Sequence, residues 1–225
     1  MNVLEIAPPT RAQMAQLLEQ YAPLRPVPLC PELLAHCAHS LIDVWEAAER
    51  LARRPLPAPF WAYPWAAGSA LARVLLDRPQ LVVGKRVLDF GAGGGVASLA
   101  AARAGAASVV ANDIDATALL VCRIAAAAHG VRIDTRHADV CRDPAYAAQF
   151  DVVLCSDLHY ERHEAPRQKR VLARAQRAGA DVIVADAGRT YFDASGLELL
   201  AEYEVPVPAD LEGTPTRVAR VFRLR

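Results

Sequence analysis

The segment that decides the fold of this chain is VLDFGAGGG, residues 87–95. An apolar run that contains one acid, Asp89, leads directly into three spaced glycines, Gly91, Gly93 and Gly95. Glycine permits positive φ angles and lets a ligand approach the backbone closely. The Ala-rich residues that follow predict a helix, whose first N–H groups have no partner within the helix. We therefore expect a strand, a ligand-binding loop and a helix in this order.

Outward from this segment, apolar runs that predict strands alternate with Ala- and Leu-rich runs that predict helices. This alternation is typical of an α/β fold with a mostly parallel sheet. The last two strands differ, because a short turn-rich segment joins them as in a hairpin. The predicted strands are Arg86–Phe90, Ser108–Asn112, Arg132–His137, Phe150–Ser156, Asp181–Ala185, Glu202–Val207 and Thr216–Arg223, and the predicted helices span about residues 94–104, 116–129 and 163–178.

The N-terminal residues have a different pattern, in which prolines separate two helical stretches. Apolar residues within residues 10–21 fall on one helical face. Pro31 can open a second helix, which runs to about Arg54, because a proline at the first helical position loses no hydrogen bond. We interpret residues 1–58 as a helical N-terminal extension of a main domain that spans residues 59–225.

The composition limits the partners and the compartment. Hydrophobic residues make up 53% of the 225 residues and charged residues 22%, as in globular proteins. The 25 basic residues balance the 25 acidic ones, so we expect no nucleic-acid and no membrane partner. The first ten residues lack the pattern of a signal peptide, and no apolar run is long enough for a membrane span. Five cysteines without a C-x-x-C motif predict free thiols and a cytoplasmic protein.

The glycine pattern separates two classes of ligand. A dinucleotide loop reads G-x-G-x-x-G/A, but Val96 occupies the sixth position counted from Gly91. Asp89 would repel a pyrophosphate and attract the ammonium of an amino acid moiety. The loop therefore favours S-adenosylmethionine over NAD, with a purely structural turn as the alternative.

Three acids follow the next two strands. Asp113 lies 22 residues after Gly91, the spacing at which an acid in doubly wound folds accepts hydrogen bonds from ribose hydroxyls. Asp115 competes for this role, but we expect it to cap the following helix. Asp139 follows the third strand and either accepts a hydrogen bond from an adenine amino group or is an ordinary polar loop residue.

Together these features resemble the class I, seven-strand S-adenosylmethionine-dependent methyltransferases. The resemblance covers about residues 60–225. It implies a Rossmann-like doubly wound seven-stranded sheet, mostly parallel with the last strand antiparallel, which agrees with the hairpin-like pair at the end of the chain. It also implies that residues 59–225 form the methyltransferase domain.

The fourth strand ends in Asp157-Leu158-His159-Tyr160, and this D-x-x-Y form resembles the family 16 protein lysine methyltransferases. The nucleophile in lysine methylation is a neutral amine, although lysine is mostly protonated at pH 7. Asp157 can hold and aim the amine, and Tyr160 can form a wall of the pocket that faces the cation. His159 is either a structural residue or a base. We expect no metal site, because no H-E-x-x-H pattern occurs here.

Three more segments narrow the resemblance to the electron transfer flavoprotein β-subunit lysine methyltransferases and their bacterial relatives. They are PFWAYPWAAG (residues 59–68), NDID (112–115) and DAGR (186–189), where Ala187 replaces the proline of the family pattern. The resemblance implies a protein substrate, the electron transfer flavoprotein β subunit, with a ribosomal protein as a second candidate. Trp65 and its neighbours either line the pocket or pack the N-terminal helices onto the sheet. Arg189 either forms a salt bridge or contacts the substrate.

A basic stripe follows the D-x-x-Y motif. Arg170 and Arg174 belong to a set of arginines on one face of the predicted helix at 163–178, which is either a solvated face or a docking surface for an acidic substrate protein. Two alternative functions remain, a small-molecule N-methyltransferase for a nicotinamide-like amine and a non-catalytic cofactor-binding domain. A small-molecule enzyme needs a lid over Asp157 and Tyr160, whereas a protein-modifying enzyme leaves this region open.

Overall fold

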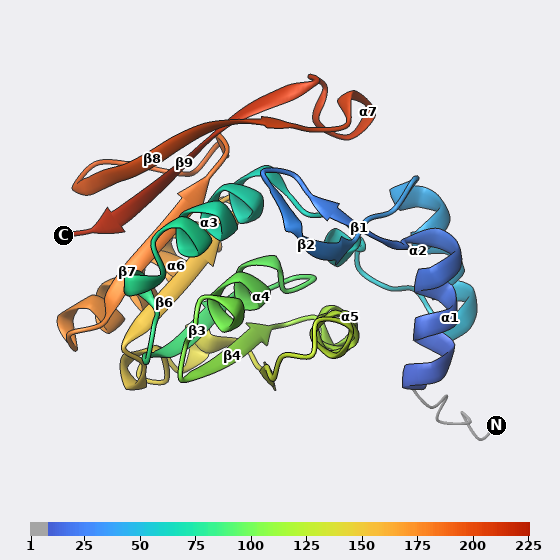
Figure 1. Ribbon diagram of the computed structural model, residues 1–225, viewed down its shortest axis with the longest axis horizontal. Helices are drawn as coiled ribbons and strands as arrows, with labels where there is room; N and C mark the ends of the chain where they lie inside the picture. Colours follow the sequence, from blue (N-terminus) through green and yellow to red (C-terminus); the bar gives the residue numbers. More distant parts are fainter. Residues whose placement is uncertain (1–8) are drawn as a thin grey trace.

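The computed structural model describes residues 9–225 (Figure 1). The prediction about a signal pattern concerns mainly residues that lie outside this range. The main sheet has seven strands in the order β5-β4-β3-β6-β7-β9-β8. Its strands are β3 (Arg86–Phe90), β4 (Ser108–Asp113), β5 (Asp134–His137), β6 (Val152–Ser156), β7 (Asp181–Asp186), β8 (Leu197–Pro206) and β9 (Thr216–Leu224).

The strand directions confirm the predicted fold class. The pairs β3–β4, β4–β5, β3–β6 and β6–β7 are parallel, and β9 is antiparallel to both of its neighbours, β7 and β8. The chain moves outward from β3 in one direction through β4 and β5, and in the other direction through β6 and β7. The topological switch point therefore lies at the carboxyl end of β3, where doubly wound folds bind their ligands.

Helices cover both faces of the sheet because side chains alternate along each strand. Val87 and Leu154 point to the face covered by α3, α4 and α5, whereas Leu88 and Val153 point to the face covered by α6 (Figure 1). Both sets are fully buried, so the strands read as continuous apolar runs. The helices are α3 (Ala66–Asp77), α4 (Val96–Arg103), α5 (Ala116–Ala128), α6 (Ala165–Arg177) and α7 (Ala209–Glu212), with 3-10 turns at Phe60–Ala62, Pro79–Leu81, Val140–Arg142 and Ala147–Gln149.

The N-terminal region corrects one prediction. The helix expected from Pro31 to about Arg54 begins only at Leu41, because Cys30–His36 forms a strand, β2, paired with β1 (Leu24–Val27). Periodicity misled here because the apolar side chains of a short strand also fit a helical face. The helices of this region are α1 (Arg11–Tyr21) and α2 (Leu41–Ala52).

The N-terminal region packs on the rest of the chain in two ways. The β1–β2 hairpin contributes Cys30 and Leu33, both fully buried, to the large core above the sheet. Helices α1 and α2 form a second core with Trp61 and one side of α5. These contacts fit an extension without an independent core, and the boundary at residues 58 and 59 stays a prediction.

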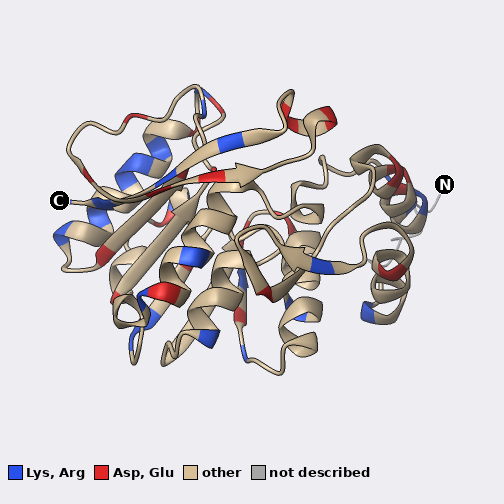
Figure 2. Cartoon of the chain, turned by 45° about the horizontal axis from the view of Figure 1, so that its top comes forward, with Lys and Arg blue, Asp and Glu red and all other residues tan. Residues whose placement is uncertain are grey.

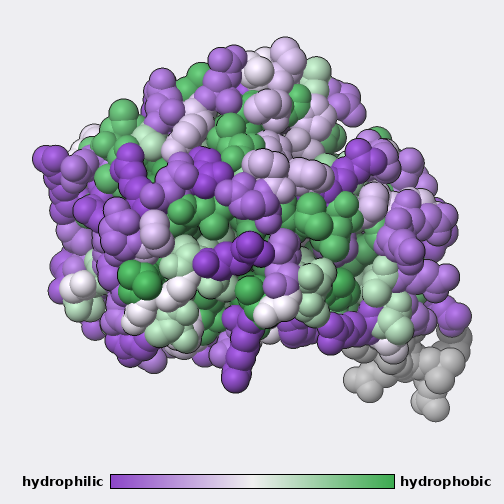
Figure 3. All heavy atoms as spheres, in the orientation of Figure 1, coloured by the Kyte–Doolittle hydropathy of each residue, from purple (hydrophilic) through white to green (hydrophobic). Residues whose placement is uncertain are grey.

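None of the helices within residues 9–225 is both long enough and apolar enough to cross a membrane. On the face shown in Figure 3, hydrophobic side chains form separate patches between polar ones. In the described part of the chain, no three His, Cys, Asp or Glu side chains are grouped so that they could hold a metal ion. The five cysteines are free.

Candidate active site

The glycine loop after β3 requires its glycines for two different reasons. Gly91, Gly93 and Gly95 have φ angles of +76°, +52° and +86°, a conformation that residues with a Cβ atom rarely adopt. A Cβ on Gly91 would lie within 2.4 Å of Leu158, and one on Gly95 would lie within 2.4 Å of the Cys122 sulfur. A Cβ on Gly93 would meet no heavy atom within 4 Å, so this glycine borders open space. The loop is therefore closely packed below and open at Gly93.

Asp113, the last residue of β4, reaches the glycine loop directly. Its Oδ2 accepts a hydrogen bond of 2.8 Å from the backbone N–H of Gly93, and its Oδ1 accepts one of 2.9 Å from the N–H of Asp115. Burial raises the pKa of Asp113. Asp115 caps α5 by accepting a 2.7 Å hydrogen bond from Thr117, as predicted. Asp113 thus lies against the glycine loop, whereas Asp115 caps α5.

Asp89 lies beneath the glycine loop rather than on its open side. The residue is 1% exposed, and its Oδ2 accepts a 2.6 Å hydrogen bond from the hydroxyl of Ser98 in α4. Burial raises the pKa of Asp89 to about 6. This bond ties β3 to the first turn of α4 and holds the loop between them. The cofactor contact expected of Asp89 stays a prediction.

Asp139 lies at the end of β5 in an ion-pair network. Its Oδ1 accepts a hydrogen bond from the N–H of Cys141, and its Oδ2 pairs with Arg167 at 2.7 Å and with Arg142 at 3.2 Å. Burial opposes ionisation, but the bond from Arg167 and the Cys141 N–H together lower the pKa of Asp139. Of the two interpretations of Asp139, this geometry favours the structural loop residue.

Asp157 is a buried carboxylate at the carboxyl end of β6. Its side chain is 10% exposed and its φ is +52°, a conformation that Asp tolerates better than most residues. Its Oδ1 accepts a 2.8 Å hydrogen bond from Nε of Arg189, and its Oδ2 accepts one of 3.1 Å from the N–H of Ala67 in the first turn of α3. Burial raises the pKa of Asp157, and Arg189 acts against this rise.

Tyr160 belongs to an aromatic cluster that lies next to Asp157. Its ring centre is 5.7 Å from that of Phe60, which is 6.1 Å from Trp65, and Trp65 is 5.5 Å from Tyr63. Tyr160 and Phe60 are 45% and 50% exposed, whereas Tyr63 is buried. The segment at residues 59–68 thus contacts the D-x-x-Y loop through Phe60 and packs against the N-terminal helices through Trp61. A role of Trp65 in lining the pocket stays a prediction.

Arg189 connects this site to the end of the chain. Its guanidinium carbon lies 5.6 Å from the centre of the Trp65 ring, and its Nη2 lies 3.4 Å from Oε1 of Glu212 in α7. Glu212 pairs in turn with Arg217 at 3.1 Å. Sequence analysis missed Glu212 and Arg217, because no local pattern marks them and only the β8–β9 hairpin brings them to β6. For Arg189, the salt bridge is the interpretation that the geometry favours.

Two predicted groups lie apart from this arrangement. Arg170 and Arg174 are exposed on α6, and within residues 9–225 neither is linked to the site's aspartates by a hydrogen bond or ion pair. His159 is 2% exposed, contacts Phe192 with its ring edge and has a pKa lowered to about 4 by burial. His159 therefore packs away from Asp157 and favours the structural interpretation.

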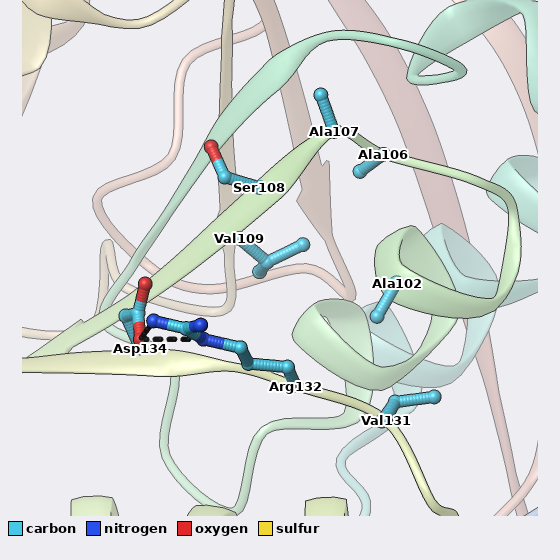
Figure 4. A pocket seen from close by; sticks show the side chains of 8 residues that line it. All are labelled: Ala102, Ala106, Ala107, Ser108, Val109, Val131, Arg132 and Asp134. Carbon is cyan, nitrogen blue, oxygen red and sulfur yellow. Dashed lines mark hydrogen bonds and ion pairs between the residues drawn. The ribbon is translucent and has the colours of Figure 1, made fainter.

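Two cavities lie away from this site. A hollow of about 410 Å³ is lined by Ser108, Arg132 and Asp134 among others, at the amino ends of β4 and β5 (Figure 4). It is thus at the opposite edge of the sheet from the glycine loop. A smaller cavity of about 220 Å³ lies between α6 and the β7–β9 side of the sheet, with His159 on its wall. Neither cavity contains the glycine loop or Asp157.

Comparison with known proteins agrees with the geometry. Residues 87–182 match a family described as a methyltransferase domain. The chain is 31% identical to the electron transfer flavoprotein beta subunit lysine methyltransferase of Rattus norvegicus over 186 residues, which are 79% of this chain and 70% of that protein. It is 33% identical to the Xenopus laevis protein of the same name, over 79% of this chain and 73% of that protein.

Solved structures confirm the fold. TrmN from Thermus thermophilus superposes with a TM-score of 0.52 at 24% identity and covers 68% of this chain and 48% of its own. RsmC, a 16S rRNA methyltransferase from the same organism solved with AdoMet and guanosine, has a TM-score of 0.51 at 21% identity, over 72% of this chain and 43% of its own. With the sequence relatives above, these findings show that the chain is an S-adenosylmethionine-dependent methyltransferase that belongs to the family of the electron transfer flavoprotein beta subunit lysine methyltransferases.

Proposed function

We propose that this enzyme transfers a methyl group from S-adenosylmethionine to the side-chain amine of a lysine in a protein, the electron transfer flavoprotein β subunit. The observation that carries the proposal is the relation between Asp157 and Tyr160. Asp157, whose side chain is 10% exposed, and Tyr160, which is 45% exposed, lie three positions apart in the loop that follows β6. A lysine side chain is long enough to place its amine beside the carboxylate while its protein remains outside. The names of the sequence relatives support the choice of this substrate.

The cofactor would be held at the carboxyl ends of β3 and β4. The open side of the loop at Gly93 leaves room for the amino acid moiety, and Gly91 and Gly95 keep the loop in its shape. Asp113, which lies against the loop at Gly93, would accept hydrogen bonds from the ribose. Asp89 would act from beneath by fixing the loop, and its charge favours the ammonium. The cofactor supplies a methyl group on a sulfonium, which is open to in-line attack.

The amine must arrive neutral and in line, so positioning is the main task of the protein. Asp157 would accept a hydrogen bond from the amine and aim its lone pair. Tyr160 would form the wall that faces the cation produced by transfer, because aromatic faces attract cations. Trp65 lies behind this wall in contact with Arg189. His159 points away and has no role in this arrangement.

The open entrance favours a protein substrate over the two alternatives. Phe60 and Tyr160 are about half exposed, and no segment within residues 9–225 buries them as a lid would. A small-molecule enzyme would need such a lid to exclude water. A non-catalytic domain would not need an aspartate that is buried and held by two donors. The five free cysteines suit a reducing compartment, and we propose the cytoplasm.

The test is direct methylation. The enzyme is incubated with labelled cofactor and the purified electron transfer flavoprotein β subunit from an organism that carries a close relative, and in parallel with a ribosomal stalk protein. We expect label on a lysine of the β subunit, located by mass spectrometry. Label on the ribosomal protein alone would reject the substrate, and label on small amines alone would reject protein methylation. Automethylation is easy to identify, because the chain has two lysines, Lys85 and Lys169.

A further inference from the structure

Four side chains of alternating charge, from separate segments of the protein, form a chain of ion pairs beside the proposed amine site. Arg189 bridges two carboxylates, with its Nε 2.8 Å from Oδ1 of Asp157 and its Nη2 3.4 Å from Oε1 of Glu212. Arg217 closes the chain, with its Nε 3.1 Å from Oε2 of Glu212. Asp157 comes from the end of β6, Arg189 from the segment after β7, Glu212 from α7 and Arg217 from β9.

Glu212 is the most buried member of this chain. Its side chain is 3% exposed. A buried carboxylate is rare unless it is paired, and here two guanidinium groups pair with it. Arg217 also donates a 2.9 Å hydrogen bond from Nη2 to the backbone oxygen of Glu212. Figure 2 shows the acids of α7 in red at the tip of the hairpin formed by β8 and β9. Arg217 therefore fixes both the backbone and the carboxylate of Glu212.

Arg189 is held in a single orientation by these contacts. Its backbone N–H donates to Asp186 at 2.8 Å, and its guanidinium lies near the Trp65 ring. Without Glu212, Nη2 would lose its carboxylate, and the guanidinium could turn away from Asp157. The other oxygen of Asp157 has the Ala67 N–H as its partner. The orientation of the Asp157 carboxylate thus depends on the position of Arg189.

We propose that Glu212 is a positioning residue for methyl transfer, which acts through Arg189 to set the orientation of the Asp157 carboxylate. In this arrangement Glu212 acts through its direct partner Arg189 and has no part of its own in holding the amine or the methyl donor. The inference rests on the proposed role of Asp157. It extends the active site to the connection between β8 and β9, which lies outside residues 87–182, the part that matches the methyltransferase-domain family.

The pKa of Asp157 provides a readout of the position of Arg189. A residue that only stabilised the hairpin fold would not change this pKa. Burial is the largest influence on the pKa of Asp157 and raises it, Arg189 lowers it, and Glu212 raises it. Asp186 is the other charged group that faces Asp157 from β7. Removal of the Glu212 charge by itself would lower the pKa of Asp157, whereas loss of the Arg189 guanidinium from Asp157 raises it. A positioning role therefore predicts that Glu212→Gln raises the pKa of Asp157 as Arg189→Met does, and a Glu212 charge that acted directly on Asp157 would lower it.

The decisive experiment is a pH titration of the Asp157 side-chain carbon by NMR in protein labelled at the aspartate carboxyl carbons, with Asp157→Asn to assign the signal. It needs no substrate, so it tests the inference even if the β subunit is not methylated. We expect the midpoint to move up in Glu212→Gln, in the same direction as in Arg189→Met, because both variants take the guanidinium away from Asp157. Glu202→Gln removes an exposed partner of Arg220 on the same hairpin and should move nothing. A downward or unchanged midpoint in Glu212→Gln would overturn the proposal.

Kinetics supply the second measurement, with whichever substrate the wild type methylates. Glu212→Gln should lower kcat about 10-fold at an unchanged Kd for the cofactor. The double variant with Arg189→Met should be no slower than Arg189→Met alone, because the two residues act in series. Additive losses would contradict the proposal. Glu212→Asp keeps the charge but shortens the reach, so it decides the question if Glu212→Gln does not fold; an unchanged kcat in this variant would also overturn the proposal.

Discussion

Arg189 and Asp157, 32 positions apart in the sequence, are joined by a 2.8 Å hydrogen bond between Nε and Oδ1. The bond connects the segments that follow two neighbouring parallel strands, β6 and β7, at the carboxyl edge of the sheet. It holds a carboxylate whose side chain is 10% exposed, in the same loop as the exposed Tyr160. The arrangement makes Asp157 a residue whose replacement should affect chemistry rather than cofactor binding.

Asp157→Asn should lower kcat at least about 100-fold, because an amide cannot supply the negative charge that holds the amine. Asparagine tolerates the positive φ of this position, so the fold should survive. Cofactor Kd, measured by calorimetry, should stay within about twofold of the wild-type value, a ratio worth less than about 0.5 kcal/mol. The control Asp193→Asn, at an exposed partner of Lys169, should leave both quantities unchanged. Loss of cofactor binding in Asp157→Asn would show that its role is assigned wrongly.

Asp113 and Asp115 form a matched pair of variants. Asp113→Ala should raise the cofactor Kd about 10-fold, because it removes hydrogen bonds to the ribose worth about 1 to 1.5 kcal/mol. Asp115→Ala should instead lower the free energy of unfolding by about 1 kcal/mol, since it removes the cap of α5. Calorimetry and thermal unfolding of both variants check this. The opposite pattern, with affinity lost in Asp115→Ala, would reverse the two assignments.

Alanine variants of three glycines can distinguish backbone strain at positive φ from a steric clash of the added Cβ atom. Gly93→Ala and Gly130→Ala both place a side chain at positive φ without a clash, so each should cost about 1 to 2 kcal/mol of stability. Only Gly93→Ala should also weaken cofactor binding, because its methyl group enters the open side of the loop. Gly95→Ala should be much less stable than either, since its Cβ would lie 2.4 Å from the Cys122 sulfur. Equal cofactor affinity in Gly93→Ala and Gly130→Ala would place the binding site elsewhere.

Charge reversal on α6 tests whether this helix docks the substrate protein. The double variant Arg170→Glu, Arg174→Glu should raise the substrate KM about 10-fold, because like charges would then meet an acidic partner surface. Cofactor affinity should not change, since neither arginine is paired within the site. Reversal of Arg103 and Arg132, which are exposed at the opposite edge of the sheet, is the control. An unchanged KM for the α6 variant would make the stripe an ordinary solvated face.

The buried Asp89 predicts a pH dependence of stability. Its pKa rises from 3.8 to about 6 in the folded protein, so the folded state binds the proton more tightly than the unfolded state. This contribution to the free energy of unfolding is present below about pH 4 and is lost as the pH rises to about 6. The Asp89→Asn side chain still accepts a hydrogen bond from Ser98, but it does not ionise, so the stability of this variant does not fall in this pH range. Relative to the wild type, it should gain up to ~3 kcal/mol between pH 4 and pH 7 in urea unfolding. A pH-independent difference would mean that Asp89 titrates normally.

Much of the fold follows from local sequence. The strands around the glycine loop are predicted to within about two residues, apart from the longer β8, because buried parallel strands are short apolar runs bounded by turns. The order of the sheet and the antiparallel last strand follow from a resemblance rather than from periodicity. The first half of the helix predicted after Pro31 is wrong, since pairing with β1 and burial of Leu33 outweigh a helical pattern.

The site divides in the same way. Sequence alone identified the residues that belong to contiguous motifs, because a glycine loop with its acid and a strand that ends in D-x-x-Y are local patterns. It also separated the role of Asp115 from that of Asp113. It did not identify Glu212, whose neighbours in the sequence carry no chemical signal and whose partner Arg189 lies in another segment.

The sequence by itself determined the α/β fold, the glycine loop and the aspartate at the end of β6, since each depends on residues within a few positions of one another. Only the tertiary structure decided that Asp89 lies beneath the loop and that Asp139 pairs with Arg167. It also brings Arg189 to Asp157 and Glu212 to Arg189. The physical reason is that burial and ion pairing depend on the distances between side chains from different strands and connections. These distances are set only when the strands assemble in the order β5-β4-β3-β6-β7-β9-β8.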